Sequence, residues 1–183
     1  MKKVQSTNYG RIRFCFVVLS VFGQLGCNNT AQKHQPNTLN TETKKKSTME
    51  QDKLKTFGEK YAKAWCSQQP DSVAAYFTIN GLLSVNDAAP AVGREAIAKT
   101  AQSFMTAFPD MIVRMDSLVT TSNGIEFHWT LTGTNSVTGG TGNKVHVSGV
   151  EIWQFDSNGL INESKGSFDA AEYNRQLNKS VTK

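Results

Sequence analysis

The sequence predicts an α+β domain in which helices pack on one face of an antiparallel sheet. Apolar residues recur at helical spacing between about residue 51 and Phe108. From Met111 onward, long β-type segments alternate with turns that contain Ser, Asn and Gly. Helices first and a meander of strands afterwards are typical of a layered α+β fold.

The first 26 residues have the pattern of a secretory signal. Residues 1–13 are basic and contain no acid, and Phe14 to Leu25 is an apolar run. The run is too short to span a bilayer, which takes about 20 residues. The following Leu-Gly-Cys resembles the lipobox of bacterial lipoproteins, although Gln24 stands where these proteins prefer an aliphatic residue. We therefore expect lipidation at Cys27 and a location in the bacterial cell envelope, on a membrane and facing either the periplasm or the outside.

Residues 27–50 are predicted to be a disordered polar tether. Beyond Cys27 they hold one Leu, one Met and no aromatic residue, which is too little apolar area to offset the entropy of ordering. The formal net charge of +5 belongs to the signal and this tether. Residues 51–183 hold 12 Lys and Arg against 13 Asp and Glu, a net −1, so the domain lacks the basic face of a nucleic-acid binder.

Within the domain, residues 51–183, three helices are expected before the sheet. The first starts at about Gln51 and carries an apolar stripe. A short second helix over Ser72 to Phe77 follows a Pro-Asp start signal, and the third runs from Gly93 to Phe108. The apolar stripe of the first helix is formed by Leu54, Phe57, Tyr61, Ala64 and Trp65.

Five strands and a last helix complete the expected domain. The last helix covers Ala170 to Leu177. The strands are expected over Leu82–Val85, Met111–Thr121, Ile125–Asn135, Lys144–Asp156 and Leu160–Asp169.

Four segments resemble one family. "VGREAI", "FMTAFPDMIV", "FHWTLTGTNS" and "FDAAEYNRQL" are similar, in this order, to the SnoaL-like branch of the nuclear transport factor 2-like superfamily, over roughly Lys53 to Leu177. The resemblance implies a curved antiparallel sheet wrapped over three N-terminal helices, with a deep apolar pocket inside the cone. Members include polyketide cyclases, ketosteroid isomerases, limonene epoxide hydrolases and proteins without chemistry, so the fold does not assign the function.

The candidate pocket residues come from strand alternation and from the resemblance. Glu126, His128 and Thr130 share one strand face, which by resemblance looks into the cone. Glu151 and Trp153 share a face with Val147. The expected ligand pocket consists of Trp65, Asn86, His128, Thr130, Glu151, Trp153 and Asp169.

Catalysis would need an acid and base, and the candidates are His128 with Asp169 or Glu151. Asp169 could equally cap the last helix. By resemblance, the acid/base Asp of polyketide cyclases and the second Asp of epoxide hydrolases both fall on Gly166, which has no side chain to titrate. We therefore expect binding rather than catalysis, and we expect no metal or cofactor, since neither metal-ligand spacing nor a phosphate loop is present.

Three functions remain open from the sequence. The first is a membrane-tethered domain that binds a small apolar or amphipathic molecule in its cone. The second is a divergent isomerase, cyclase or hydrolase that uses a His–carboxylate pair. The third is an interaction module that forms a homodimer through the outer sheet face and has a vestigial pocket.

Overall fold

The computed structural model describes residues 38–179, with side chains from residue 50 onward. The signal segment and Cys27 lie outside the described residues. The chain from Thr38 onward forms one compact unit. No helix in this described part is both long and apolar enough to cross a membrane. Its elements are α1 (Thr38–Trp65), α2 (Pro70–Ala74), β1 (Phe77–Val85), β2 (Ala91–Val92), α3 (Gly93–Ala107), β3 (Ile112–Thr121), β4 (Gly124–Thr134), β5 (Lys144–Phe155), β6 (Ile161–Phe168) and α4 (Ala170–Leu177).

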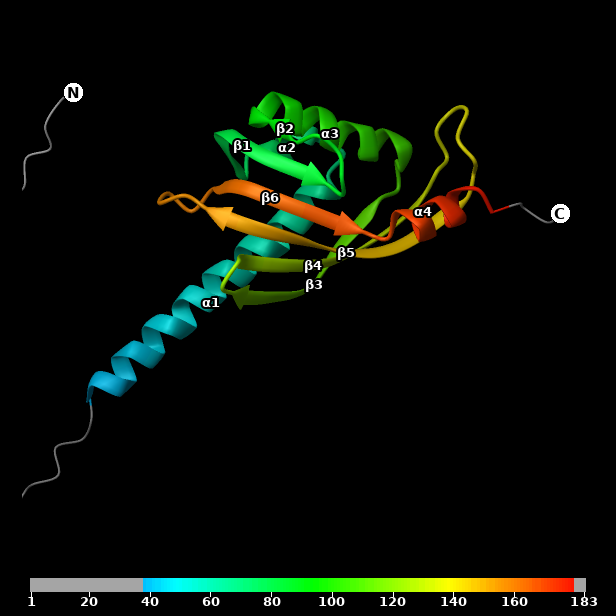
Figure 1. The fold of residues 1–183 in the computed structure, drawn as a ribbon. Coiled ribbons are helices and arrows are strands. Elements are labelled where there is room, and N and C mark those ends of the chain that lie inside the picture. The colour runs from blue at the N-terminus through cyan, green and yellow to red at the C-terminus, as the bar shows by residue number, and fades with distance from the viewer. Residues whose placement is uncertain (1–37, 180–183) are drawn as a thin grey trace, which may run out of the picture. The chain divides into compact units, whose positions relative to one another are not determined.

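Helix α1 begins earlier than expected. We predicted a disordered tether through residue 50, but the backbone is helical from Thr38, so the tether prediction is wrong for residues 38–50. Adding a turn to an existing helix costs far less than nucleating one, and this segment contains Glu and Lys, which are good helix formers. The first turns of α1 extend past the sheet in Figure 1.

The six strands form one curved sheet in the order β2-β1-β6-β5-β4-β3. Strands β3 to β6 form the expected antiparallel meander. Strand β1, however, pairs parallel with β6, so the sheet is mixed rather than wholly antiparallel. Strand β1 also begins at Phe77, where we expected the second helix to end. The reason is that Phe77 is fully buried and pairs with Ile161 of β6.

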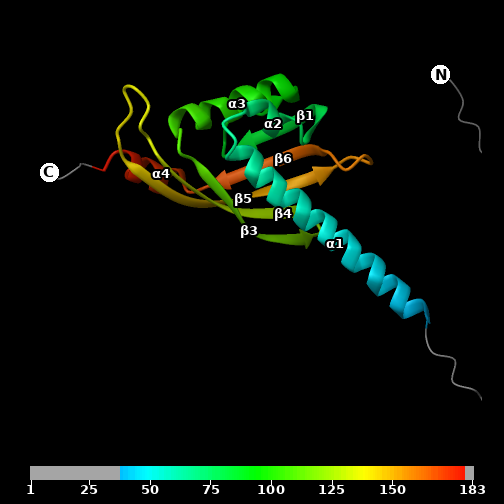
Figure 2. The same ribbon diagram turned by 180° about the vertical axis from the view of Figure 1, so that it is seen from behind.

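The three N-terminal helices cover one face of the sheet, as predicted. Figure 2 shows α1 crossing the sheet, with α2 and α3 beside its upper end. Tyr61 and Trp65 of α1 and Ile97, Ala101 and Met105 of α3 are buried in the core. These residues recur at helical spacing, so burial of the predicted apolar stripes holds the helices on the sheet. The α+β cone-type fold is confirmed.

An aromatic cluster joins α1 to the sheet. The Tyr61 ring packs edge-on against Phe127 and Trp153, with ring centroids 5.5 and 5.1 Å apart. Phe127 and Trp153 stack at 4.6 Å across β4 and β5. All three side chains are fully buried. Edge-to-face and offset contacts of this kind add stabilisation beyond the burial of area, so this end of the core is firmly packed.

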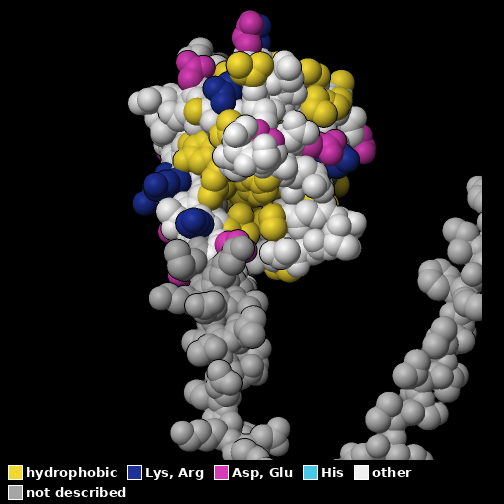
Figure 3. Space-filling view, turned by 90° about the vertical axis from the view of Figure 1, so that its left-hand side faces the viewer, with side chains coloured by type: hydrophobic (Ala, Val, Ile, Leu, Met, Phe, Trp, Pro, Cys, Tyr) yellow, Lys and Arg dark blue, Asp and Glu magenta, His cyan; other side chains and the backbone are white. Residues whose placement is uncertain are grey.

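Charged side chains of both signs are interspersed on the surface. On the face drawn in Figure 3, apolar side chains gather at the centre, and Lys, Arg, Asp and Glu lie scattered around them. This mixture agrees with the small net charge of residues 51–183 counted from the sequence.

Candidate functional site

An apolar cavity lies between the helices and the sheet. About 50 Å³ inside it is open to the centres of water-sized spheres, and the atom-free space is about 500 Å³ when the open mouth is counted. Helices α1 and α3 supply Trp65 and Phe104, and strands of the sheet supply the rest. The full wall consists of Trp65, Leu83, Val85, Phe104, Val113, Trp129, Leu131, Glu151, Gly166 and Phe168. Four of these side chains are aromatic and only Glu151 is ionisable. The wall is therefore mainly apolar and suits an apolar molecule.

Glu151 is buried at the wall of this cavity. Its Oε2 accepts three hydrogen bonds, from the Tyr61 hydroxyl at 3.0 Å, Trp153 Nε1 at 2.9 Å and the Ser164 hydroxyl at 2.7 Å. None of the three reaches Oε1. One carboxyl oxygen is therefore held by α1, β5 and β6 together, while the other accepts no hydrogen bond from the described residues.

Burial raises the pKa of the Glu151 carboxyl above its ordinary value, and its three hydrogen bonds only partly oppose this rise. No Lys, Arg or His forms an ion pair with it in the described part of the chain. The pKa of Tyr61 is also raised well above its usual range, by burial and then by the nearby Glu151 charge. A buried carboxyl without a cationic partner favours its protonated form.

Two buried indole N–H groups belong to residues of the cavity wall and make no hydrogen bond with the described residues. Trp65 Nε1 and Trp129 Nε1 are the only buried side-chain nitrogen or oxygen atoms in the described residues that make no hydrogen bond. Both side chains belong to the cavity wall. The Trp65 indole lies near the Tyr61 hydroxyl, although without the geometry of a hydrogen bond. Such atoms are rare in native structures, because each forfeits about 1–3 kcal/mol.

The prediction that the His128 face of β4 looks into the cone is wrong. Phe127, Trp129 and Leu131 face the core, and His128 lies on the opposite face with Thr130. The larger apolar side chains take the face that the helices cover, since burying them stabilises the fold most. His128 Nε2 instead lies 3.1 Å from Glu126 Oε2. The proposed acid/base pair of His128 with Glu151 is therefore not formed, because the sheet separates the two side chains.

Thr130 is buried, but on the outer face. Its hydroxyl donates to Asp116 at 2.6 Å and lies 2.8 Å from the Ser148 hydroxyl. The hydrogen bond from Thr130 is the main cause that lowers the pKa of the Asp116 carboxyl. Thr130 thus belongs to a polar cluster between β3, β4 and β5 and not to the cavity.

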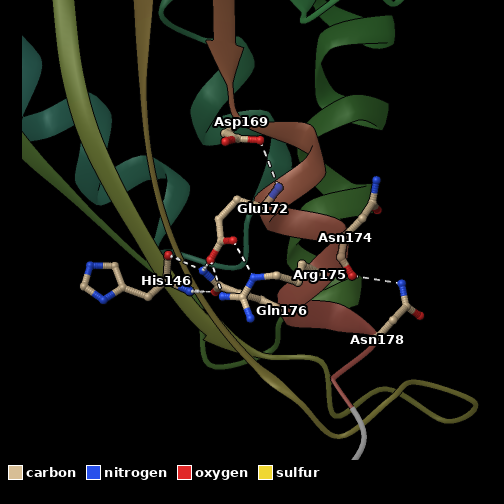
Figure 4. Close-up of polar contacts among 7 residues, drawn as sticks. All are labelled: His146, Asp169, Glu172, Asn174, Arg175, Gln176 and Asn178. Carbon is tan, nitrogen blue, oxygen red and sulfur yellow. Dashed lines mark hydrogen bonds and ion pairs between the residues drawn. The ribbon is translucent and has the colours of Figure 1, made fainter.

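Asp169 and Asn86 have structural positions at the ends of strands. Asp169 accepts a hydrogen bond from the Glu172 backbone N–H at 2.9 Å and caps α4, as one of the two readings of the sequence proposed. Figure 4 shows this cap and, beside it, His146, whose ring points away from α4. The side-chain oxygen of Asn86 accepts from the Phe168 backbone N–H at 2.9 Å. Neither Asp169 nor Asn86 lines the cavity.

Of the seven residues expected to line the pocket, Trp65 and Glu151 do so. Trp153 does not line it but donates a hydrogen bond to Glu151. Trp129 and Leu131 also line the cavity and were not expected there, although the period of two along β4 places them on one apolar face. Tyr61 and Ser164 could not be predicted as partners of Glu151, because they come from α1 and β6. The other unexpected wall residues are Leu83, Val85, Phe104, Val113 and Phe168.

Gly166 lies opposite Glu151 on the neighbouring strand and forms part of the cavity wall. By resemblance, the catalytic Asp of enzymatic relatives falls at this position. Here the glycine leaves room beside the Glu151 side chain, since a Cβ at position 166 would lie 3.5 Å from Glu151 Cγ. The carboxyl of this cavity therefore comes from β5 instead of β6. In the described residues, no group of three or more His, Cys, Asp and Glu is arranged to hold a metal ion.

Solved structures share this fold at low sequence identity. A protein with a ketosteroid isomerase-like fold from Catenulispora acidiphila DSM 44928, solved in complex with trimethylamine, is 14% identical with a TM-score of 0.58, over 64% of this chain and 88% of its own. A protein named SnoaL-like polyketide cyclase from Jannaschia sp. CCS1 is 17% identical with a TM-score of 0.58, over 82% of this chain and 99% of its own.

A nuclear transport factor 2-like protein of unknown function from Burkholderia pseudomallei K96243 is 17% identical with a TM-score of 0.57, over 67% of this chain and 95% of its own. At these identities the likeness concerns the fold. No curated protein matches the sequence. The model of the family described as SnoaL-like polyketide cyclase matches residues 55–177, and the chain therefore belongs to this family.

Proposed function

We propose that this protein is a membrane-tethered binding domain that holds a small apolar or amphipathic molecule in the cavity between α1, α3 and the sheet. The observation that carries the proposal is the composition of the wall: nine of its residues are apolar, aromatic or glycine, and one is the carboxyl of Glu151. Apolar pockets with a small number of polar groups are the usual form of small-molecule sites. The tether part of the proposal rests on the Leu-Gly-Cys segment that ends at Cys27.

The test is a thermal-melt screen of the mature chain against small terpenoids, aromatic ketones, sterol fragments and short fatty acids. A ligand present at 100 times its dissociation constant is expected to stabilise the fold by about 2.7 kcal/mol. Val85→Phe adds bulk to the cavity wall and is expected to abolish the shift. Val119→Phe makes the same change on an exposed position of β3 and is its matched control. Hits that stabilise both variants equally would contradict binding in this cavity.

An acid/base enzyme is the second candidate, because a specific observation favours it. Glu151 combines burial, a raised pKa and a free oxygen at an apolar cavity, and perturbed carboxyls of this kind cluster at catalytic sites. Glu151 would then act alone as acid and base, without His128 as its partner. Glu151→Gln is then expected to keep ligand binding and to lower turnover of a bound carbon acid by about 10²- to 10⁴-fold. Unchanged turnover in this variant would exclude the role.

A further inference from the structure

A polar groove lies between α4 and the start of β5 and shares no wall residue with the apolar cavity. About 390 Å³ of it is open to the centres of water-sized spheres. Three of its six wall residues are positively charged at neutral pH, and none is acidic. The wall therefore favours an anion. It consists of Asn143, Lys144, His146, Arg175, Gln176 and Lys179.

Two side-chain amides hold the walls of the groove together. Gln176 of α4 accepts from the His146 backbone N–H at 2.6 Å and donates to the His146 carbonyl oxygen at 2.9 Å, as a neighbouring strand would. Figure 4 shows these two contacts between the helix and the strand. Asn143 donates to the carbonyl oxygens of Leu177 and Lys179, at 2.7 and 2.8 Å. The backbones of the two walls therefore have a fixed spacing.

The cations of the groove have hydrogen-bond donors to spare. Lys144 and Lys179 form no ion pair within the described part of the chain. Arg175 binds Glu172 through Nε and Nη2, each at 2.6 Å, and its Nη1 donates to none of the described residues. A guanidinium has five N–H donors, so the contact with Glu172 fixes its orientation and leaves the other donors for a bound group.

The acids near the groove are occupied by neighbouring groups of the protein. The pKa of Glu172 is lowered to about 2, chiefly by the hydrogen bonds from Arg175. Asp110 is close enough to Lys144 to feel its charge. Its two carboxyl oxygens, however, accept from the Thr134 N–H at 2.6 Å and from the Thr134 hydroxyl at 2.7 Å. The groove thus presents donors without matching acceptors, the complement of a negatively charged group with several oxygens.

We propose that this groove binds a phosphate group, to which Lys144, Arg175 and Lys179 donate hydrogen bonds. Lys and Arg are the residues that recognise phosphate, and three donors on separate side chains suit a tetrahedral group better than a planar carboxylate. The phosphate belongs either to a soluble phosphate ester or to a lipid headgroup, which present the same group to the groove. The site is separate from the apolar cavity and does not depend on the function proposed for it.

The first test is an NMR titration of the mature chain, with Cys27→Ser to leave it without a lipid, against inorganic phosphate. The backbone amide signals of Lys144, His146 and Gln176 are expected to shift and to reach saturation. Sodium chloride at the same ionic strength is the reference, because it screens surface charges to the same extent. Shifts that never saturate, or that chloride reproduces in full, would overturn the site.

Lys144→Gln and Lys179→Gln are each expected to weaken phosphate binding by about 2- to 5-fold, as the loss of one exposed ion pair does, and the double variant is expected to bind more weakly than either. Both side chains are exposed, so the fold is expected to survive. Lys60→Gln is the matched control, since Lys60 is an exposed lysine of α1 outside the groove. An equal loss in Lys60→Gln would show that only net charge matters and would contradict a site in the groove.

Vesicles of phosphatidylcholine, with and without phosphatidic acid, distinguish the two sources of the phosphate. For a lipid headgroup, the chain is expected to sediment only with vesicles that contain phosphatidic acid, and the double variant is expected to stay in solution. For a soluble phosphate ester, inorganic phosphate saturates the groove while the chain stays in solution with both kinds of vesicle. Sedimentation that the double variant retains in full, without saturable binding of phosphate, would place the attraction on another surface and overturn the proposal.

Discussion

Glu151 and Gly166 face each other across the β5–β6 ladder, and the glycine leaves beside Glu151 a space that a side chain would enter. A Cβ at position 166 would lie 3.5 Å from Glu151 Cγ and 3.1 Å from the Ser84 carbonyl oxygen. A side chain at position 166 would therefore lie in contact with the Glu151 side chain.

Gly166→Asp is expected to place a second carboxyl against the first. Two carboxylates in one apolar site cannot both ionise without mutual repulsion. Gly166→Asn has nearly the same shape and no charge, so it is the control for steric strain. The Asp variant is expected to lose stability relative to Asn as the pH rises from 5 to 8, by at least about 1.4 kcal/mol, the value of one pKa unit. Parallel denaturation curves of the two variants at all pH values would contradict this arrangement.

Glu151→Gln is expected to change how stability depends on pH. The pKa of Glu151 in the folded protein lies above its ordinary value of 4.5, so the folded state holds the proton more tightly than the unfolded state. Its stabilising contribution is complete below about pH 4.5 and is lost as the pH rises through the raised pKa. The variant is therefore expected to gain stability relative to wild type over that rise. Urea denaturation across the pH range measures this. A stability difference between variant and wild type that stays constant with pH would show that the pKa of Glu151 is not raised by folding.

Tyr61→Phe removes one of the three donors to Glu151 Oε2 from a fully buried position. Its loss is expected to cost about 1–3 kcal/mol of unfolding free energy, because the carboxyl loses a partner that water cannot replace. Tyr76→Phe is the control, since its half-buried ring packs against Phe57 and its hydroxyl does not reach Glu151. Chemical denaturation of both variants checks this. An equal loss of unfolding free energy in Tyr61→Phe and Tyr76→Phe would mean that the hydrogen bond from the Tyr61 hydroxyl to Glu151 does not stabilise the fold.

His128→Phe is expected to leave ligand binding within twofold of wild type. His128 lies on the outer sheet face beside Glu126, and the sheet separates it from the cavity. The measurement is the dissociation constant of any hit from the melt screen. A loss of affinity as large as that caused by Val85→Phe would place the ligand on the outer face.

Cys27→Ser tests the anchor. If Cys27 carries the lipid, wild-type protein is expected in the membrane fraction, and the variant is expected to be either uncleaved or released. Fractionation followed by mass spectrometry of the N-terminus distinguishes these cases. Soluble wild-type protein that starts a few residues away from Cys27 would refute the lipoprotein proposal.

Local pattern was sufficient for most of the elements. The apolar stripes of α1 and α3, the turns of the meander and the cap at Asp169 are all encoded within a few neighbouring residues. The inward position of Glu151 with Val147 and Trp153 also follows from the period of two along β5, and all three are buried.

Tertiary structure decided the site. Strand alternation divides β4 into two faces, but which face looks into the cone depends on where the helices pack, and they cover Phe127, Trp129 and Leu131 instead of His128. The partners of Glu151 come from three elements and lie up to 90 residues from Glu151 along the chain. Their meeting depends on the register of β5 with β6 and on the position of α1, which are set by burial of the whole core and not by any local signal.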